Sequence, residues 1–135
     1  MQIITQNNKI KVTINRASWA DMNLLKQEAL KCLDIKNIGF DFTNQVEFTD
    51  MCASLLIKAE TSQTFNEALF RCLKYCNYDD AIPITEQLME DKPQLIEDYY
   101  EIASNCIEVN LRPFFKSLVT EFKRRFKLPI QDNQE

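Results

Sequence analysis

Helical periodicity is most extended between Pro93 and Lys127, where apolar residues recur every three or four positions. Such spacing places them on one face of a helix. They are Ile96, Tyr99, Ala103, Cys106 and Ile107 before Pro113, and Phe114, Leu118, Val119, Phe122 and Phe126 after it. Proline inside a helix removes a backbone hydrogen bond and clashes with the preceding turn. The pattern therefore predicts two helices that meet at a bend near 110–113, with Phe114 and Phe115 packed at the elbow.

Shorter helical patterns precede this segment. They predict helices over residues 18–35, from 43 or 49 to 60, 64–76 and 85–90, with a polar loop at 77–83. Ser18 is placed to cap the first helix, and Thr64 begins a capping box that ends at Glu67. Trp19 is predicted to pack under the N-terminal strands. The buried stripe of the second helix is predicted to be Phe48, Met51, Cys52, Leu55, Leu56 and Ala59.

The first 15 residues alternate with the period of a half-buried strand, since Ile10, Val12 and Ile14 are separated by polar residues. Asn7–Asn8 supplies residues that tolerate the positive φ of a tight turn. A hairpin with strands at 2–6 and 9–14 is therefore predicted. We expect one mainly α domain over residues 1–135: this hairpin (1–15), a compact bundle of about five helices (17–127) and a flexible tail (128–135).

Composition limits the chemistry. Hydrophobic residues make up 45% and charged residues 27% of the 135 residues, which is typical of a globular domain. Gly39 is the single glycine and there is no histidine, so a glycine-rich phosphate loop and the usual general base are both missing. Carboxylates remain as candidates for catalysis or for metal binding. Glu97, Asp98 and Glu101 are predicted to form a solvated face, and the pair at 79–80 is weak evidence for a metal. Neither catalysis nor a cofactor is expected.

All five cysteines fall on apolar faces of predicted helices, where a free thiol packs as a small hydrophobe. They are Cys32, Cys52, Cys72, Cys76 and Cys106. Their odd number and the lack of an export signal indicate a reducing compartment. Cys72 and Cys76 share a helical face, but a zinc site needs about four ligands and the sequence offers no histidine to complete it. Packing in the core is therefore predicted.

The net charge of −4 is unevenly distributed. Acidic residues dominate from Asp79 to Glu101, whereas Lys and Arg dominate from Arg112 to Lys127. The two segments are expected to pair within the chain, although such a layout also suits a partner of opposite charge. No apolar run approaches the roughly 20 residues of a membrane span.

Residues 113–127, PFFKSLVTEFKRRFK, allow several interpretations. The favoured one is a core helix whose basic last turn complements the negative end of its own dipole. Binding of a protein partner comes second, because the phenylalanine stripe exceeds what a small bundle must cover. Binding to a membrane surface or to nucleic acid ranks behind both, and neither partner is expected.

Two long segments carry a family resemblance: EALFRCLKYCNYDDAIPITEQLMED, and EDYYEIASNCIEVNLRPFFKSL. Together with the strand pair that leads through VTINRAS into the first helix, they resemble the small tail assembly chaperones of long-tailed bacteriophages. The resemblance extends from about Ile3 to Phe126. It is most specific at Ala68–Leu73 and in the segment that runs from Asp98–Glu101 to Asn110 and Pro113–Phe115. Both parts carry packing signatures rather than a catalytic code.

The resemblance implies a non-catalytic protein made in the cytoplasm of an infected cell and absent from the mature virion. Such chaperones bind the long helical tape measure protein, keep it soluble and help tail tube subunits assemble around it. Many are also made in a longer, frameshifted form. Tape measure protein, and with it the tail tube protein, are thus the expected partners, together with self-association of the chain.

An apolar surface on the last helices is the hypothetical site for the client. It comprises Tyr99, Tyr100, Phe114, Phe115, Leu118 and Phe122. An alternative from another class is a small phage or bacterial regulatory protein that binds nucleic acid through the basic residues near Lys123–Lys127, in which case binding would depend on salt. A third, a metal-dependent enzyme, would need carboxylates that hold an ion.

Overall fold

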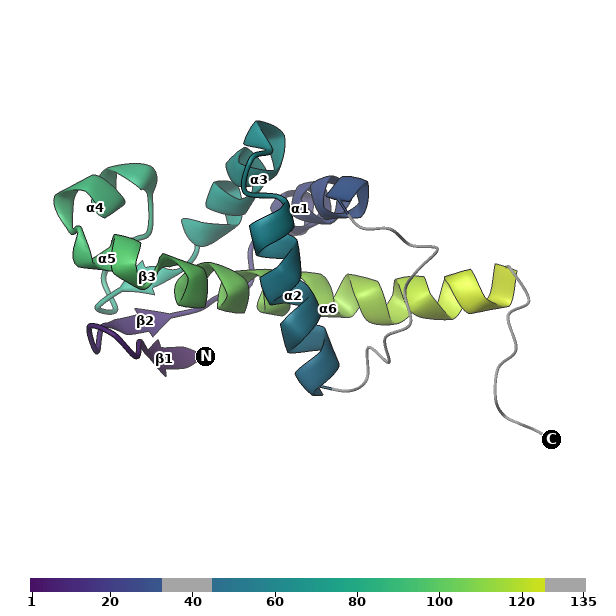
Figure 1. The fold of residues 1–135 in the computed structure, drawn as a ribbon, viewed down its shortest axis with the longest axis horizontal. Helices are drawn as coiled ribbons and strands as arrows, with labels where there is room; N and C mark the ends of the chain where they lie inside the picture. The colour runs from purple at the N-terminus through teal and green to yellow at the C-terminus, as the bar shows by residue number, and fades with distance from the viewer. Residues whose placement is uncertain (33–44, 126–135) are drawn as a thin grey trace.

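The computed structural model describes residues 1–32 and 45–125, which are mostly helical with a small antiparallel sheet (Figure 1). Its strands are β1 (Gln2–Ile4), β2 (Lys11–Thr13), β3 (Asn77–Tyr78) and β4 (Ile82–Pro83). Its helices are α1 (Trp19–Cys32), α2 (Gln45–Lys58), α3 (Gln63–Leu73), α4 (Glu86–Asp91), α5 (Gln94–Glu97) and α6 (Tyr99–Arg125). The mainly α prediction is confirmed, but a compact bundle of about five helices is not confirmed. Residues 33–44 and 126–135, for which predictions were also made, lie outside the described residues.

The long helix α6 is the element against which α1, α2 and α3 all pack (Figure 1). This helix has 27 residues and runs without a break through Pro113, so the predicted pair of helices that meet at a bend near 110–113 is wrong. Leu111 and Phe115, on either side of the proline, are both completely buried. Burying one such side chain is worth about 1.5–3 kcal/mol, and two of them offset the roughly 3 kcal/mol that proline costs a helix.

Asn110 supports the same stretch of α6 from inside the core. Its Nδ2 donates to the carbonyl of Cys106 at 2.8 Å, and its Oδ1 accepts from the backbone N–H of Ala17 at 2.9 Å. Both contacts are buried, so neither group competes with water. The second contact ties α6 to the segment that leads into α1.

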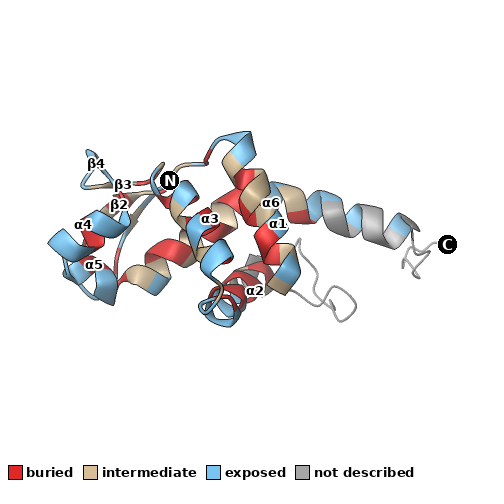
Figure 2. Cartoon of the chain, turned by 90° about the horizontal axis from the view of Figure 1, so that it is seen from above, coloured by how far each residue is buried: buried red, intermediate tan, exposed pale blue. Residues whose placement is uncertain are grey.

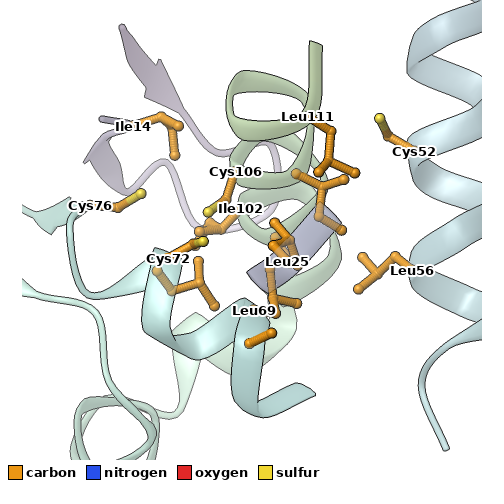
Figure 3. Packing of buried hydrophobic residues seen from close by; sticks show 14 of the residues in the cluster. Ile14, Leu25, Cys52, Leu56, Leu69, Cys72, Cys76, Ile102, Cys106 and Leu111 are labelled. Carbon is orange, nitrogen blue, oxygen red and sulfur yellow. The ribbon is translucent and has the colours of Figure 1, made fainter. Parts of the chain in front are cut away.

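The core lies between α6 and the three helices that cover it (Figure 2). The predicted stripe of α2 is buried throughout, and Phe48 from this stripe meets Phe115 edge to face with ring centroids 6.4 Å apart. Cys72, Cys76 and Cys106 gather in this core (Figure 3), and Cys52 is buried as well. Burial raises the pKa of Cys72 to about 12, as expected for a packing thiol. All five cysteines are free, and only Cys32 is partly exposed.

The sheet has four strands in the order β1-β2-β3-β4, so the predicted polar loop at 77–83 is wrong. These residues form a second hairpin, in which Asp79 and Asp80 both have positive φ (52° and 65°) and Ala81 N–H donates to the carbonyl of Tyr78. That geometry is a type I′ turn, which matches the twist of the flanking strands. Asp80 also binds Lys11 of the neighbouring strand with an N–O distance of 2.6 Å. Asp80, one of the two carboxylates considered for a metal, therefore has a lysine as its partner.

Two predicted helix starts have different outcomes. Ser18 Oγ accepts from the backbone N–H of Asp21 at 3.3 Å, which confirms the first cap. The third helix begins earlier than predicted, because Ser62 rather than Thr64 is its N-cap and accepts from Phe65 N–H at 3.2 Å. Thr64 instead donates from its hydroxyl to Glu28 at 2.8 Å. The prediction for Trp19 is wrong, since 69% of this residue is exposed.

The N-terminal hairpin docks on the junction between α5 and α6. Asp98 interrupts the helix predicted after Pro93 and lies between the two helices with only 2% of its surface exposed. Its Oδ2 accepts from the Thr5 hydroxyl at 2.8 Å and from Asn8 Nδ2 at 3.1 Å. Asp98 is therefore a buried anchor, which corrects its assignment to a solvated face.

Glu97 and Glu101 flank this anchor and contact the same turn. Glu97 Oε1 accepts from Asn8 Nδ2 at 2.9 Å, and Glu101 Oε1 accepts from the backbone N–H of Gln6 at the same distance. Because the Asn8 side chain is engaged with α5, the positive φ of the turn falls on Lys9 (54°) instead of the predicted asparagines. The acidic cluster fixes the hairpin to the helices.

Asp98 gives the fold a defined dependence on pH. Burial raises the pKa of this carboxyl, but hydrogen bonds from Thr5 and Asn8 outweigh burial and hold the pKa below its ordinary value. A carboxyl with a lowered folded-state pKa stabilises the fold fully above its unfolded pKa of about 3.9, and this contribution is lost as the pH falls through the folded-state pKa.

We expect Asp98→Ala to lower the free energy of unfolding by about 1.5–3 kcal/mol at pH 7, the range for hydrogen bonds to a charged group. The variant should also lose less stability than the wild type between pH 6 and pH 3. Urea unfolding at several pH values measures both quantities. Glu90→Ala, which removes an exposed carboxylate, is the matched control. Parallel stability curves for the wild type and Asp98→Ala would contradict the anchoring role.

Candidate protein-binding groove

The six residues predicted to bind a client lie in different environments along α6. Phe115 is completely buried against Phe48 and therefore has no surface to offer a partner, which corrects its assignment. Phe114 is half-buried, and the Lys26 ammonium lies 5.2 Å from the centre of its ring. Leu118 and Phe122 belong to α6, but their side chains lie outside those that the structure describes.

Tyr99 and Tyr100 are the two predicted residues that the structure brings together. They begin α6 and line a hollow of about 400 Å³ that is completed by α3, α4 and α5. A second hollow of about 440 Å³ adjoins it, because both include Phe70 and Glu86. The groove formed by the two hollows is lined by Thr61, Gln63, Asn66, Glu67, Phe70, Glu86, Met89, Glu90, Ile96, Tyr99 and Tyr100. We call this surface the acidic groove.

Aromatic rings form the floor of the acidic groove. Phe70 of α3 stacks on Tyr99 with ring centroids 6.2 Å apart and an interplanar angle of 16°, and Tyr99 meets Tyr100 edge to face at 5.5 Å. Ile96 and Tyr100 are 58% and 53% exposed. Exposed apolar side chains next to one another are a feature of surfaces that bind other molecules.

Carboxylates surround this floor. Glu67, Glu86 and Glu90 line the groove, and Glu60 accepts a 2.6 Å hydrogen bond from the Tyr100 hydroxyl. Among the described residues that line the groove there is no lysine or arginine. The local charge is therefore negative.

The nearby carboxylates contribute to a raised pKa of both tyrosine hydroxyls. Burial is the main reason that the pKa of Tyr99 rises to about 12, and Glu60 and Glu86 raise it further. The hydrogen bond to Glu60 and the charge of the same carboxylate raise the pKa of Tyr100. Because a negative neighbour disfavours a second negative charge, the raised pKa of Tyr100 indicates the sign of the potential in the groove, whereas that of Tyr99 reflects burial first.

An apolar floor with an acidic border is complementary to a helix that carries an apolar stripe flanked by lysine or arginine. Helices of this kind bind grooves through apolar residues spaced three and four apart, and charges at the border favour the correct partner and speed its association. Within the described parts of the chain, no cluster of three or more potential metal ligands is found. The described helices also include none that is long and apolar enough to cross a membrane.

Several groove residues were not predicted from the sequence. Phe70 was not among the residues predicted to bind a client, and Ile96 was counted only with the apolar face of the last helices. Both belong to a surface built from segments that are distant in sequence. The adjacent tyrosines at 99 and 100 are the residues of this groove that the sequence analysis named as part of an apolar surface.

Comparison of the chain with protein-family models, with curated proteins and with solved structures gives no match.

Glu60 should control the ionisation of Tyr100. We expect Glu60→Gln to lower the pKa of Tyr100 towards the ordinary tyrosine value of about 10, because the substitution removes the negative charge that now opposes ionisation. Titration of tyrosine labelled with ¹³C at Cζ, followed by NMR, resolves the individual rings. Glu47→Gln, on the helix α2 that ends two residues before Glu60, is the control. If Tyr100 titrates identically in Glu60→Gln and the wild type, the contact does not persist in solution.

Proposed function

We propose that this protein is a non-catalytic phage tail assembly chaperone that binds the tape measure protein in the acidic groove. In this role it keeps the client soluble in the cytoplasm of the infected cell, aids assembly of the tail tube and is absent from the finished virion. The tape measure protein is a long helical client, and an amphipathic helix is the partner that the groove complements.

One observation supports this proposal above the others. The two parts that most specifically resemble the tail assembly chaperones, Ala68–Leu73 and the segment that begins with Asp98–Glu101, meet at the acidic groove. Phe70 from the first stretch stacks on Tyr99 from the second. Stretches that carry the resemblance thus form the floor of the groove as well as packing in the core.

The contacts in the groove suit a reversible chaperone. Ile96 and Tyr100 already present apolar surface, and burying such surface is worth roughly 25 cal/mol per Å². The carboxylates at the border add attraction that falls with increasing salt, since their charges are exposed. A client helix would therefore be held firmly enough to stay soluble and released when tube subunits compete for it.

Removing the exposed apolar contacts should weaken binding of the client. For Ile96→Ala/Tyr100→Ala we expect about a tenfold or greater loss of affinity for the tape measure protein encoded with this chain, because central aromatic contacts carry much of the energy of an interface. Co-expression, pull-down and calorimetric titration with helical fragments of the tape measure protein measure this change. The variant should remain folded, since both side chains are more than half exposed.

Trp19→Ala is the matched control, because Trp19 is a large exposed side chain on α1 that does not line the groove. It should bind as the wild type does. The proposal fails if the tape measure protein does not bind the wild type, or if the double variant and the control bind it equally well.

A further inference from the structure

The two ends of α6 carry opposite charge. Its N-terminal end contributes Tyr99 and Tyr100 to the acidic groove. Its C-terminal end continues into a sequence in which Lys116, Lys123, Arg124, Arg125 and Lys127 face a single acidic residue, Glu121. The same sequence spaces Leu118 and Phe122 four residues apart, a spacing that places them on one face of a helix. This chain therefore contains a helix with the apolar and basic character that its own groove complements.

The basic end cannot reach the groove of its own chain. Because α6 is continuous through Pro113, its 27 residues span about 40 Å at 1.5 Å per residue. The acidic groove lies at the start of this span, beside α4 and α5, and the basic end lies at the other end of the molecule (Figure 1). The expectation that the acidic and basic segments pair within the chain does not hold for these two surfaces.

We propose that the acidic groove of one copy binds the basic C-terminal end of α6 from a second copy. Charge complementarity identifies this occupant, since Glu67, Glu86 and Glu90 border the groove and the five basic residues lie on the incoming segment. Phe70, Tyr99 and Tyr100 provide the apolar floor for its Leu118 and Phe122.

A contact of this kind joins two different surfaces, so it is head-to-tail. After one contact forms, the pair still has one groove and one basic end available. Association therefore continues into an open chain, or it closes into a ring if the rotation between copies allows. The same groove cannot hold a client helix and a second copy at once, so self-association and client binding compete. The inference depends on the groove and does not require the client to be a tape measure protein.

Charge reversal tests the contact without disturbing the core. The groove variant is Glu67→Lys/Glu90→Lys, at two exposed positions, and the end variant is Lys123→Glu/Arg125→Glu. Sedimentation velocity at 50 mM salt, over a range of protein concentrations, should show species larger than the 15.9 kDa monomer for the wild type. Each variant alone should be monomeric, and circular dichroism checks that each is folded.

An equimolar mixture of the two variants is the decisive sample. In this mixture the basic groove of the groove variant can bind the acidic end of the end variant, and the acidic groove of the end variant can bind the basic end of the groove variant. The mixture should therefore associate as the wild type does. A symmetric contact through a single patch predicts a different result, because each variant alters only one of the two surfaces and the variant that leaves the patch unchanged would still associate alone. Trp19→Ala should associate normally, and 500 mM salt should dissociate the wild type because it screens exposed charges.

Three results would overturn the proposal: a wild type that is monomeric at every concentration in 50 mM salt, association that survives either charge reversal, or a mixture that stays monomeric. None of them affects the proposed function, which is tested with the client and with uncharged substitutions. Loss of client binding with intact self-association would in turn contradict the proposed function alone.

Discussion

Burial on both sides of Pro113 is the constraint on which the structure depends. A proline in the middle of a helix ordinarily breaks or kinks it, and here the helix continues because Leu111 and Phe115 are completely enclosed by the helices around them. Asn110 adds buried hydrogen bonds to the same turn. Tertiary packing thus overrides a strong local signal, and α6 remains one continuous helix.

This helix determines where each surface lies. The start of α6 carries the tyrosines of the acidic groove, and its other end carries the basic residues about 40 Å away. The N-terminal hairpin secures the junction between α5 and α6 through Asp98, which lies immediately before those tyrosines. The same Asp98 contacts therefore hold the hairpin and the start of the groove in place, and their loss would destabilise both.

Sequence patterns predicted the features that depend on local repetition. The buried stripe of α2, the Ser18 cap and the burial of most cysteines follow from a period of 3.6 residues and from capping chemistry, and the structure confirms them. Features that depend on contacts distant in sequence were missed. The β3–β4 hairpin has only two residues per strand and an Asp79–Asp80 turn, and Trp19 is exposed although aromatic residues are usually covered.

At the candidate site, too, the sequence indicated single residues but not the contacts between segments that are distant in sequence. Tyr99 and Tyr100 were named from the sequence as part of an apolar surface on the last helices, whereas Phe70, Glu60 and Glu86 join them only through the fold. Phe115 is of a residue type that is common at interfaces, but it lies in the core because Phe48 of α2 covers it. A phenylalanine stripe alone does not distinguish a binding surface from a core.

The central claim is that the acidic groove holds an amphipathic helix of the tape measure protein. Amide hydrogen exchange of this chain, with and without that protein, tests the claim most directly because it locates the contact in the sequence. The account predicts slower exchange in α3, in α4 and α5 and at the start of α6, with α1 unchanged. Slower exchange confined to α1 or the sheet, or no change in any element, would contradict it.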